Sequence, residues 1–370
     1  MKDNAPFRYD IVGSFLRPSA LKKARSEYKS GKITKEELKT VEDLAIITLI
    51  EKQKKAGLKT ITDGEFRRSS WHLDFMWAFN GVGHSKTEKG IPFNGEPALI
   101  DDTFLTGKVS IENHPFVEHF KFVKQFEDEN TVARQTIPAP AQFLFQMITP
   151  DNIKGTKAIY SDEEELIKDI AKAYTKVIKD LYDVGCRNIQ FDDCTFGVCV
   201  DPNACFIFGT DEKGLQENIE KLIRINNLVI EEKPEDLVIN THICRGNFHS
   251  TWACTGGYNR VAKDLFAKEN VNAFYLEFDD ERSGGFEPLK YVSSDKKVVL
   301  GLITTKAKEL ENKEALIKRI NEATKYIPLE RLCLSPQCGF ASTEEGNKLT
   351  EEDQWAKIKL VIEIAKEVWK

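Results

Sequence analysis

A histidine and a cysteine stand two residues apart in the stretch INTHICRGNF, residues 239–248. The apolar run that precedes them predicts a strand, and residues i and i+2 of a strand point to the same side. His242 and Cys244 should therefore face the same way where the strand ends. An imidazole and a thiol in this arrangement could hold a metal ion, although the pair also fits a structural role.

Other residues with metal-binding or acid–base chemistry also follow predicted strands. They are Ser14, Asp63 and Glu65, Asp192 and Asp193, Glu277, the acidic run 279–281, and Cys338. If the strands are parallel, their carboxyl ends meet at one face, where one imidazole, two thiols and several carboxylates converge. Two cysteines, one histidine and one glutamate suit a tetrahedral Zn²⁺ site. Asp192 and Asp193 fit a bound cation or a substrate ammonium equally well, and the acidic run also fits a solvated loop.

The other cysteines and histidines carry weaker signals. The eight cysteines include no CxxC pair, so a zinc finger is not predicted. Cys194 could approach the site, but we interpret it as a packing residue, together with Cys186, Cys199, Cys205, Cys254 and Cys333. For the remaining histidines we expect surface positions: His72, His84, His114, His119 and His249.

Eight short apolar segments alternate with amphipathic helical stretches along the chain. The predicted strands cover residues 9–14, 59–63, 132–138, 187–192, 236–241, 271–278, 297–303 and 331–336. This alternation predicts an α/β fold, a (β/α)8 TIM barrel. The alternative is an open doubly wound sheet, but no GxGxxG follows the first strand.

Helix ends and one long loop complete the predicted architecture. The patterns TKEE (34–37) and SDEE (161–164) predict capping boxes, for helices that end at Gly57 and Gly185. Thr350 should cap the last helix. Residues 80–115 are rich in Gly, Pro and Asn, and we expect an inserted excursion there, with a β-hairpin over the barrel mouth. No linker or repeat divides the chain, which predicts one domain over residues 1–370.

Composition excludes several classes of protein. The 370 residues are 41% hydrophobic and 30% charged, which is ordinary for a globular protein. The net charge of −6 argues against nucleic-acid binding, and the absence of a long apolar run argues against a membrane span. The N-terminus has no apolar signal-peptide core, so we expect a cytoplasmic protein with reduced thiols.

Six stretches, in this order, resemble the C-terminal catalytic barrel of the cobalamin-independent methionine synthase family. They are IVGSFLRP (11–18), DGEFRR (63–68), IQFDDC (189–194), THIC (241–244), YLEFDDERS (275–283) and LSPQCGF (334–340). The resemblance spans nearly the whole chain and implies a single methionine-synthase-like catalytic barrel. In that family a His-x-Cys pair, a Glu and a distant Cys hold zinc. The corresponding residues here are His242, Cys244, Glu277 and Cys338.

The resemblance also implies an activity. It is zinc-dependent transfer of a methyl group to the thiol of homocysteine, which forms methionine, as in a 5-methyltetrahydropteroyltriglutamate-homocysteine S-methyltransferase. Glu65 and Asp192 would face the substrate ammonium, and Ser14 with its neighbouring backbone would take the carboxylate. A structural hydrogen-bonding role is the alternative for Asp192. No residue is identified as the catalytic acid or base.

The chain departs from the family in three places. It is one barrel long, its segment VVLGLITTK lacks the family's strand-end histidine, and Phe143 and Phe145 stand near the expected folate-stacking tryptophan. The methyl donor is therefore left open between methylated folate and a corrinoid-borne methyl group, with a donor or accessory protein as a potential partner. Two alternatives are a related zinc alkyl transferase that acts on another thiol and a catalytically silent barrel that binds zinc or an amino acid.

Overall fold

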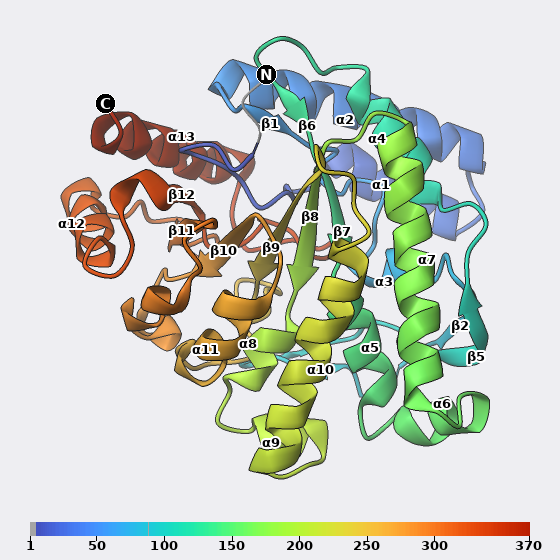
Figure 1. Ribbon diagram of the computed structural model, residues 1–370. Helices are drawn as coiled ribbons and strands as arrows, with labels where there is room; N and C mark the ends of the chain where they lie inside the picture. Colours follow the sequence, from blue (N-terminus) through green and yellow to red (C-terminus); the bar gives the residue numbers. More distant parts are fainter. Residues whose placement is uncertain (1–4, 88) are drawn as a thin grey trace.

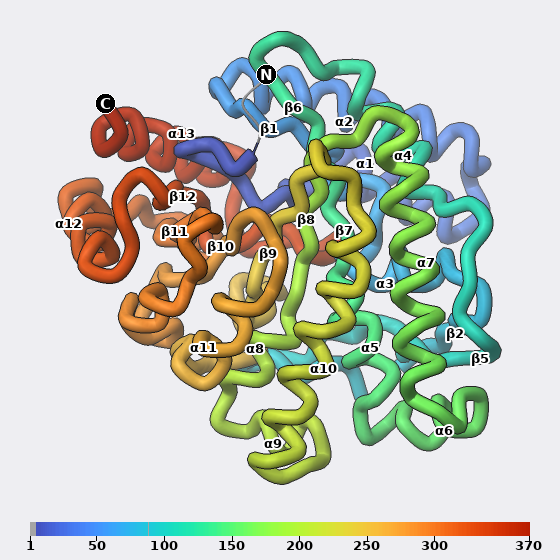
Figure 2. Tube along the Cα trace, viewed as in Figure 1, coloured from blue at the N-terminus to red at the C-terminus, as the bar shows by residue number. Residues whose placement is uncertain are grey.

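The computed structural model describes residues 5–87 and 89–370, which form a barrel of parallel strands surrounded by helices (Figures 1 and 2). The barrel strands are β1 (Thr60–Ile61), β6 (Val132–Ala133), β7 (Gln135–Pro138), β8 (Asn188–Asp193), β9 (Val238–Ile243), β10 (Ala273–Glu277), β11 (Lys297–Ile303) and β12 (Leu332–Pro336). Six of them form a parallel sheet in the order β12-β11-β10-β9-β8-β7, and β1 pairs in parallel with β6. The predicted (β/α)8 TIM barrel is confirmed.

The barrel wall is completed by short, irregular pairings near the N-terminus. Tyr9 pairs in parallel with Leu334 of β12, and the Phe15 amide donates to the Gly64 carbonyl after β1. The predicted first strand, residues 9–14, is therefore reduced to a bridge that closes the wall. The predicted strand 132–138 is divided at Arg134 into β6 and β7, because the chain there changes its pairing partner from β1 to β8.

Helices cover the outside of the barrel (Figure 1). They are α1 (Ser19–Lys29), α2 (Lys35–Ala56), α3 (Leu73–Met76), α4 (Pro115–Lys124), α5 (Pro140–Ile148), α6 (Ile153–Ile159), α7 (Glu163–Asp183), α8 (Thr195–Cys199), α9 (Ala204–Phe208), α10 (Glu212–Ile230), α11 (Asn259–Lys268), α12 (Lys313–Ala323) and α13 (Glu351–Val368), with 3-10 turns at Glu281–Ser283, Glu287–Tyr291 and Leu329–Arg331. In the described part of the chain, no helix is both long and apolar enough to cross a membrane.

The helix ends follow the sequence signals with one exception. Thr34 makes a capping box with Glu37 at the start of α2, and Gly57 ends that helix with φ +90°. Thr350 caps α13 as predicted. At α7 the predicted box at SDEE is wrong. The cap is Asp162, whose carboxylate accepts the Glu164 amide hydrogen at 3.0 Å.

The excursion after α3 forms two antiparallel strand pairs, where a single β-hairpin was predicted. β2 (Asn80–Ser85) pairs with β5 (Asp102–Ser110), and β3 (Ile91–Pro92) pairs with β4 (Pro97–Ala98). The Asn94 amide donates to the Trp252 carbonyl at 2.8 Å, and the rings of Phe93 and Phe248 lie 5.4 Å apart. These contacts fasten the second hairpin to the segment that follows β9, at the carboxyl ends of the strands.

Candidate metal centre and substrate cavity

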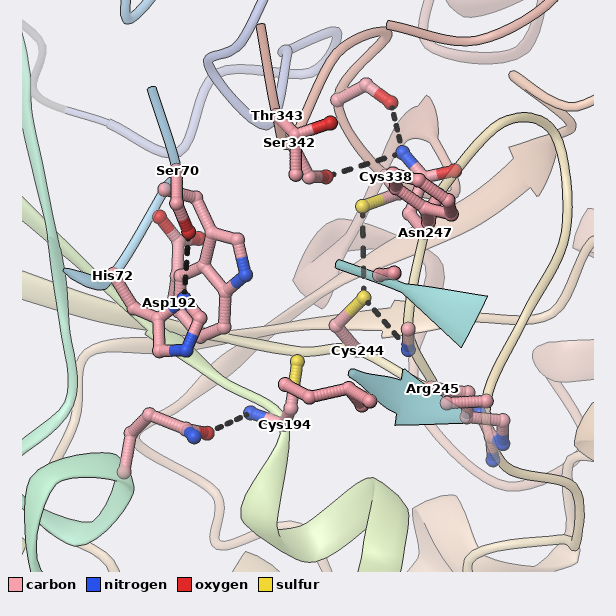
Figure 3. Close-up of a pocket in the computed structure, with 18 of the residues that line it drawn as sticks. Ser70, His72, Asp192, Cys194, Cys244, Arg245, Asn247, Cys338, Ser342 and Thr343 are labelled. Carbon is pink, nitrogen blue, oxygen red and sulfur yellow. Dashed lines mark hydrogen bonds between the residues drawn. The ribbon is translucent and has the colours of Figure 1, made fainter. Parts of the chain in front are cut away.

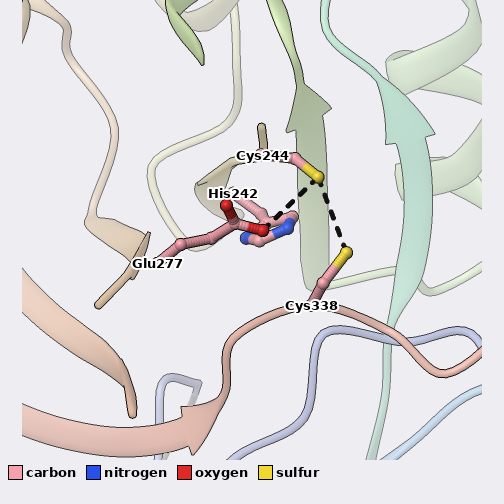
Figure 4. Close-up of side chains that lie close together, drawn as sticks. All are labelled: His242, Cys244, Glu277 and Cys338. Atoms are coloured by element: carbon pink, nitrogen blue, oxygen red, sulfur yellow. Dashed lines mark hydrogen bonds between the residues drawn. The ribbon is translucent and has the colours of Figure 1, made fainter. Parts of the chain in front are cut away.

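The four predicted ligands lie together at the carboxyl ends of three barrel strands (Figure 4). His242 is in β9 with Cys244 directly after it, Glu277 ends β10, and Cys338 follows β12. One ligand atom from each residue lies within 4.8 Å of the others. The Cys244 sulfur is 3.6 Å from both the Cys338 sulfur and Glu277 Oε1. Neighbouring parallel strands thus bring residues far apart in sequence to one point.

The chemistry of this cluster fits a soft divalent metal ion. All four side chains are buried, and both ring nitrogens of His242 lack a hydrogen-bond partner among the described residues. A buried polar group without a partner is unfavourable by about 1–3 kcal/mol. One imidazole, two thiolates and a carboxylate match the usual donors of zinc, which would satisfy these groups together.

Electrostatics around the cluster also favour a cation. Hydrogen bonding to the thiols of Cys194 and Cys338 holds the pKa of the Cys244 thiol well below its usual value. The pKa of each of those two neighbours is raised well above its usual value, because each bonds to the same sulfur and is buried. Burial raises the pKa of Glu277 to about 8. The cluster therefore accommodates one thiolate readily and further negative charge only with a compensating cation.

Two cationic side chains stand behind the cluster. The Arg245 guanidinium lies 3.7 Å from Glu277 Oε2, and the Arg245 amide donates to the same oxygen at 3.1 Å. The Lys306 ammonium is buried without a hydrogen-bond partner among the described residues, and its charge lowers the pKa of Glu277 and Cys338 against larger opposing effects. A divalent ion with two thiolates and a carboxylate carries a net negative charge, which these residues would offset.

A cavity of about 150 Å³ adjoins the cluster and is lined by Ser14, Glu65 and Asp192 together with His242, Cys244 and Cys338. Glu65 Oε1 accepts from the Thr136 hydroxyl at 3.0 Å, while its Oε2 is buried without a partner among the described residues. Asp192 Oδ1 accepts from the Gln190 amide at 2.8 Å. Burial raises the pKa of Glu65, and it raises that of Asp192 to about 7. The structure thus brings the three predicted substrate-binding residues to one cavity.

Ser14 lies against the segment that carries Cys338. Its hydroxyl oxygen accepts the Ala341 amide hydrogen at 3.3 Å, and its carbonyl accepts from Phe340 at 3.0 Å. A Cβ at Gly339 would lie 1.8 Å from the Ser14 hydroxyl oxygen, so only glycine allows this approach. The hydroxyl hydrogen of Ser14 can still be donated into the cavity.

The neighbouring carboxylates have other roles. Asp193 faces away from the cavity, where its Oδ1 accepts the Thr195 amide hydrogen at 2.8 Å and its Oδ2 accepts from Asn226 at 3.3 Å. Of the pair Asp192 and Asp193, only the first lines the cavity. In the acidic run, Asp279 and Asp280 pair with Arg282. The Asp280 side chain is exposed, which agrees with a solvated loop, whereas the Asp279 side chain is only 1% exposed and does not.

Several cavity residues are absent from the predicted site. Cys194 lines the cavity beside Cys244 (Figure 3), and Cys254 lines it as well, although we expected both to be packing residues. Cys205, also expected to pack, is only partly buried, whereas Cys186, Cys199 and Cys333 are buried as expected. The expected surface position is wrong for His72, which is 4% exposed and lines the cavity, and for His114, which is 3% exposed. The position of Cys194 directly after Asp192 and Asp193 was the available signal.

The second hairpin and the segment after β9 provide the apolar part of the cavity wall. Ile91, Phe93, Ala98 and Ile100 come from the excursion, and Phe145, Val198 and Phe248 come from the barrel side. Gly246 has φ +89°, and its amide donates to the Cys244 sulfur at 3.3 Å. A Cβ there would lie 3.0 Å from the Phe93 ring, so the hairpin packs directly against the backbone beside a candidate ligand.

The model of the cobalamin-independent synthase catalytic domain matches residues 8–367 of this chain. This chain belongs to the cobalamin-independent methionine synthase family. Membership extends over almost the whole barrel, so both the cluster and the cavity lie within the matched part. The recognised resemblance is confirmed, and the chain is related to methyltransferases of the methionine synthase kind.

Comparisons with individual relatives agree with this family assignment. The chain is 45% identical over 370 residues to the uncharacterised protein YxjG of Bacillus subtilis strain 168, and the match covers 99% of this chain and 95% of YxjG. A crystal structure from Listeria monocytogenes, provisionally described as a vitamin-B12 independent methionine synthase, is 40% identical with a TM-score of 0.78 and covers 100% of this chain and 99% of its own. A B12-independent methionine synthase from Shewanella sp. W3-18-1, solved with selenomethionine, is 21% identical with a TM-score of 0.72, covers 99% of this chain and 98% of its own, and shares the fold.

Proposed function

We propose that this protein is a zinc-dependent methyltransferase that moves a methyl group to the thiol of homocysteine and forms methionine, and that residues 1–370 act as one catalytic barrel. The observation that carries the proposal is the placement of the His242, Cys244, Glu277 and Cys338 cluster and the carboxylates of Glu65 and Asp192 around one cavity. A thiol-binding centre beside an ammonium-binding wall suits an aminothiol substrate.

His242, Cys244, Glu277 and Cys338 would hold the zinc ion. When bound, zinc would supply the positive charge that keeps a substrate thiol in its reactive thiolate form near neutral pH. In the overall reaction the sulfur electron pair forms the new bond to the methyl carbon. The bond between the methyl group and the donor breaks with its electron pair on the donor. The proton lost by the thiol goes to the donor where a basic atom is left, as on a folate nitrogen, and otherwise to solvent.

The chain's own residues would orient the amino-acid end of the substrate. Glu65 has an unpartnered buried oxygen, and Asp192 faces the same cavity, so an ammonium group placed between them offsets their desolvation. Ser14 can donate its hydroxyl hydrogen to the carboxylate. The hairpin around Phe93 covers the cavity and limits access of water, which strengthens these charged contacts.

The charges of the cavity favour homocysteine over a sulfonate thiol. Arg245 is the only lysine or arginine among the described residues that line the cavity, and its guanidinium is occupied by the Gly256 carbonyl and the Tyr258 hydroxyl. An anionic sulfonate would therefore meet two carboxylates and no available cation.

The test is methionine formation by the zinc-loaded protein from homocysteine with a panel of methyl donors. The panel contains methylated folate, methylcobalamin and a sulfonium compound, and 2-mercaptoethanesulfonate serves as the competing acceptor. We expect methionine with at least one donor and no methylated sulfonate. Methylation of the sulfonate alone, or of neither thiol with every donor, would contradict the proposal.

A further inference from the structure

The hairpin of β3 and β4, residues 91–98, is a thin part of the cavity wall with solvent on its outer side. Ile91, Phe93 and Ala98 line the cavity, yet Ile91 is also 37% exposed. Figure 3 shows the hairpin as two short teal arrows beside the segment of Cys244. Every candidate ligand and predicted substrate-binding residue is at most 7% exposed. A molecule from solvent must therefore pass a wall of the cavity to reach them.

The hairpin has little stability of its own. Its two strands pair at only two positions, Ile91 with Ala98 and Pro92 with Pro97. Neither proline has an amide hydrogen to donate to the pairing. An isolated two-stranded hairpin is marginally stable in water even when it is longer than this one. Its position therefore depends on its contacts with the segment after β9, described above, and on one charged side chain.

That side chain is Glu96, the one carboxylate of the hairpin, which contacts two other segments. Glu96 Oε1 lies 3.3 Å from the Lys348 ammonium nitrogen, and Oε2 lies 3.3 Å from His249 Nδ1. The three side chains are 36%, 66% and 30% exposed, respectively. Charged contacts at such exposure are individually weak, so they break and re-form readily.

The two partners of Glu96 belong to a rim that is itself firmly held. His249 and Ser250 have φ of +46° and +68°, a conformation that non-glycine residues keep only where their surroundings hold it. The Ser250 amide donates to Asn347 Oδ1 at 3.0 Å, and the Lys348 amide donates to the Ser250 hydroxyl at 2.9 Å. The two joined segments are those that carry the candidate cysteine ligands. The hairpin is thus a weakly fastened piece beside a rigid rim.

We propose that the β3–β4 hairpin is a lid of the cavity, and that Glu96 is the latch that holds it closed against His249 and Lys348. The lid opens when these contacts break, and the cavity is then accessible from solvent. When they re-form, the apolar face of the hairpin again covers the cavity. Glu96 is a positioning residue that does not line the cavity. The inference concerns access for any molecule, so it goes beyond the proposed function and is tested without homocysteine.

Two cysteines of the chain report on opening of the lid. Cys194 and Cys254 line the cavity and are not candidate metal ligands. The experiment measures the rate at which N-ethylmaleimide alkylates each cysteine of the intact protein incubated with zinc, by mass spectrometry of its peptides. Because the same sulfur is compared between variants, its intrinsic reactivity cancels and the ratio of rates reports access.

The charge of the latch should set these rates. Glu96→Gln removes the attraction to both partners, and alkylation of the two reporter cysteines should become about two- to tenfold faster. Glu96→Lys should give a larger increase, because it places like charges next to each other at Lys348. Combining Glu96→Lys with Lys348→Glu restores an attraction across the same contact and should return the rates towards the native values.

The chain supplies matched controls. Glu164→Gln removes an exposed carboxylate that pairs with Arg224 away from the cavity, and it should leave both reporter rates unchanged. Cys205 and Cys199 do not line the cavity. Cys205 is only partly buried and should react at one rate in every variant, whereas the buried Cys199 should stay slow.

Three results would overturn the inference. The first is native alkylation rates at the reporter cysteines in both Glu96→Gln and Glu96→Lys, which would mean that molecules enter by another route. The second is the absence of recovery in the charge-exchanged double variant. The third is an equal acceleration at Cys199, which would show general loosening of the barrel in place of movement of a lid.

Discussion

Two groups of buried polar residues lie in successive layers of the same barrel. They differ in how many of their polar atoms have hydrogen-bond or charge partners within the chain. The floor network consists of Asp10, Arg134, Gln190 and Tyr275. The Arg134 guanidinium donates to Asp10 Oδ2 at 2.7 Å, to the Tyr275 hydroxyl at 2.8 Å and to Gln190 Oε1 at 3.2 Å. The Tyr275 hydroxyl also donates to Asp10 at 2.7 Å. Within this network, the pairing of opposite charges and the hydrogen bonds compensate the loss of hydration that burial causes.

The cluster of His242, Cys244, Glu277 and Cys338 is the next layer towards the carboxyl ends. Glu277 stands two residues beyond Tyr275 on β10, and Asp192 stands two beyond Gln190 on β8, so each strand supplies one residue to both layers. Among the described residues, His242 in this upper layer and Glu65 in the adjoining cavity retain buried atoms without a hydrogen-bond partner. Among the described residues the floor leaves Arg134 Nε without a hydrogen-bond partner, but its charges are paired within the chain, whereas the upper layer is organised for a ligand.

Removing a candidate ligand should give the largest effect. Cys338→Ser replaces a soft anionic donor with a neutral hydroxyl, and zinc affinity should fall by more than the ~10–100-fold that loss of an outer contact produces. The measurement is zinc content by elemental analysis after dialysis, starting from about one ion per chain. Cys333→Ser is the matched control, because Cys333 is buried in β12 beside Tyr275 and Val299, away from the cluster. Full zinc in Cys338→Ser would contradict the ligand assignment.

Removing the charge of Arg134 from the floor network should lower the stability of the protein and leave the metal site intact. Arg134→Met leaves the Asp10 carboxylate buried without its cation, and the free energy of unfolding should fall by about 3–5 kcal/mol. Urea unfolding measures the loss, with zinc content of the folded protein as the second measurement. Arg224→Met is the control, since Arg224 pairs with Glu164 at an exposed site and should contribute about 1 kcal/mol or less. An equal loss in the two variants would remove the distinction between floor and surface.

The upper layer could be predicted from sequence because its chemistry is concentrated at strand ends. His242, Cys244, Glu277 and Cys338 each end or follow an apolar run, and parallel strands bring such ends together whatever their separation in sequence. The floor network could not be found in this way. Arg134 lies at the point where β6 passes into β7, and nothing in its local sequence indicates that it pairs with Asp10, 124 residues away.

The buried position of His72 is another feature that the sequence alone does not predict. His72 precedes a helix of only four residues, and no periodic pattern distinguishes a buried histidine from an exposed one there. Its neighbours Trp71 and Ser70 pair with Ser342 and Thr343, which approach from the far end of the chain. Long-range packing of this kind decides which of the six histidines face the cavity.

Within the cavity, Asp192→Asn should separate substrate binding from metal binding. In the proposed pose the change removes a negative charge that would face the substrate ammonium, and homocysteine affinity should fall by about tenfold to a hundredfold. Calorimetry in two buffers of different ionisation heat also counts the proton released by the substrate thiol, about one per molecule bound. Zinc content should not change. Unchanged affinity would return Asp192 to a purely structural role beside Gln190.

A third buried group differs from both layers, because a proton compensates the burial of its negative charge. Glu269, at the end of α11, accepts a hydrogen bond from Asn226 at 2.7 Å, and Asn226 also donates to Asp193 at 3.3 Å. Burial raises the pKa of Glu269 to about 8, above its value of about 4.3 in an unfolded chain. Between these values the folded protein keeps a proton that the unfolded chain releases. The free energy of unfolding therefore decreases as pH rises, by at most about 1.4 kcal/mol per pH unit from this residue, and levels off above pH 8.

Glu269→Gln removes this titration, so the difference in stability between variant and native protein should shift in favour of the variant from pH 5 to pH 8.5. Urea unfolding at both pH values measures that difference. A difference that stays constant with pH would show that Glu269 is ionised in the folded protein, and that Asn226 alone compensates its burial.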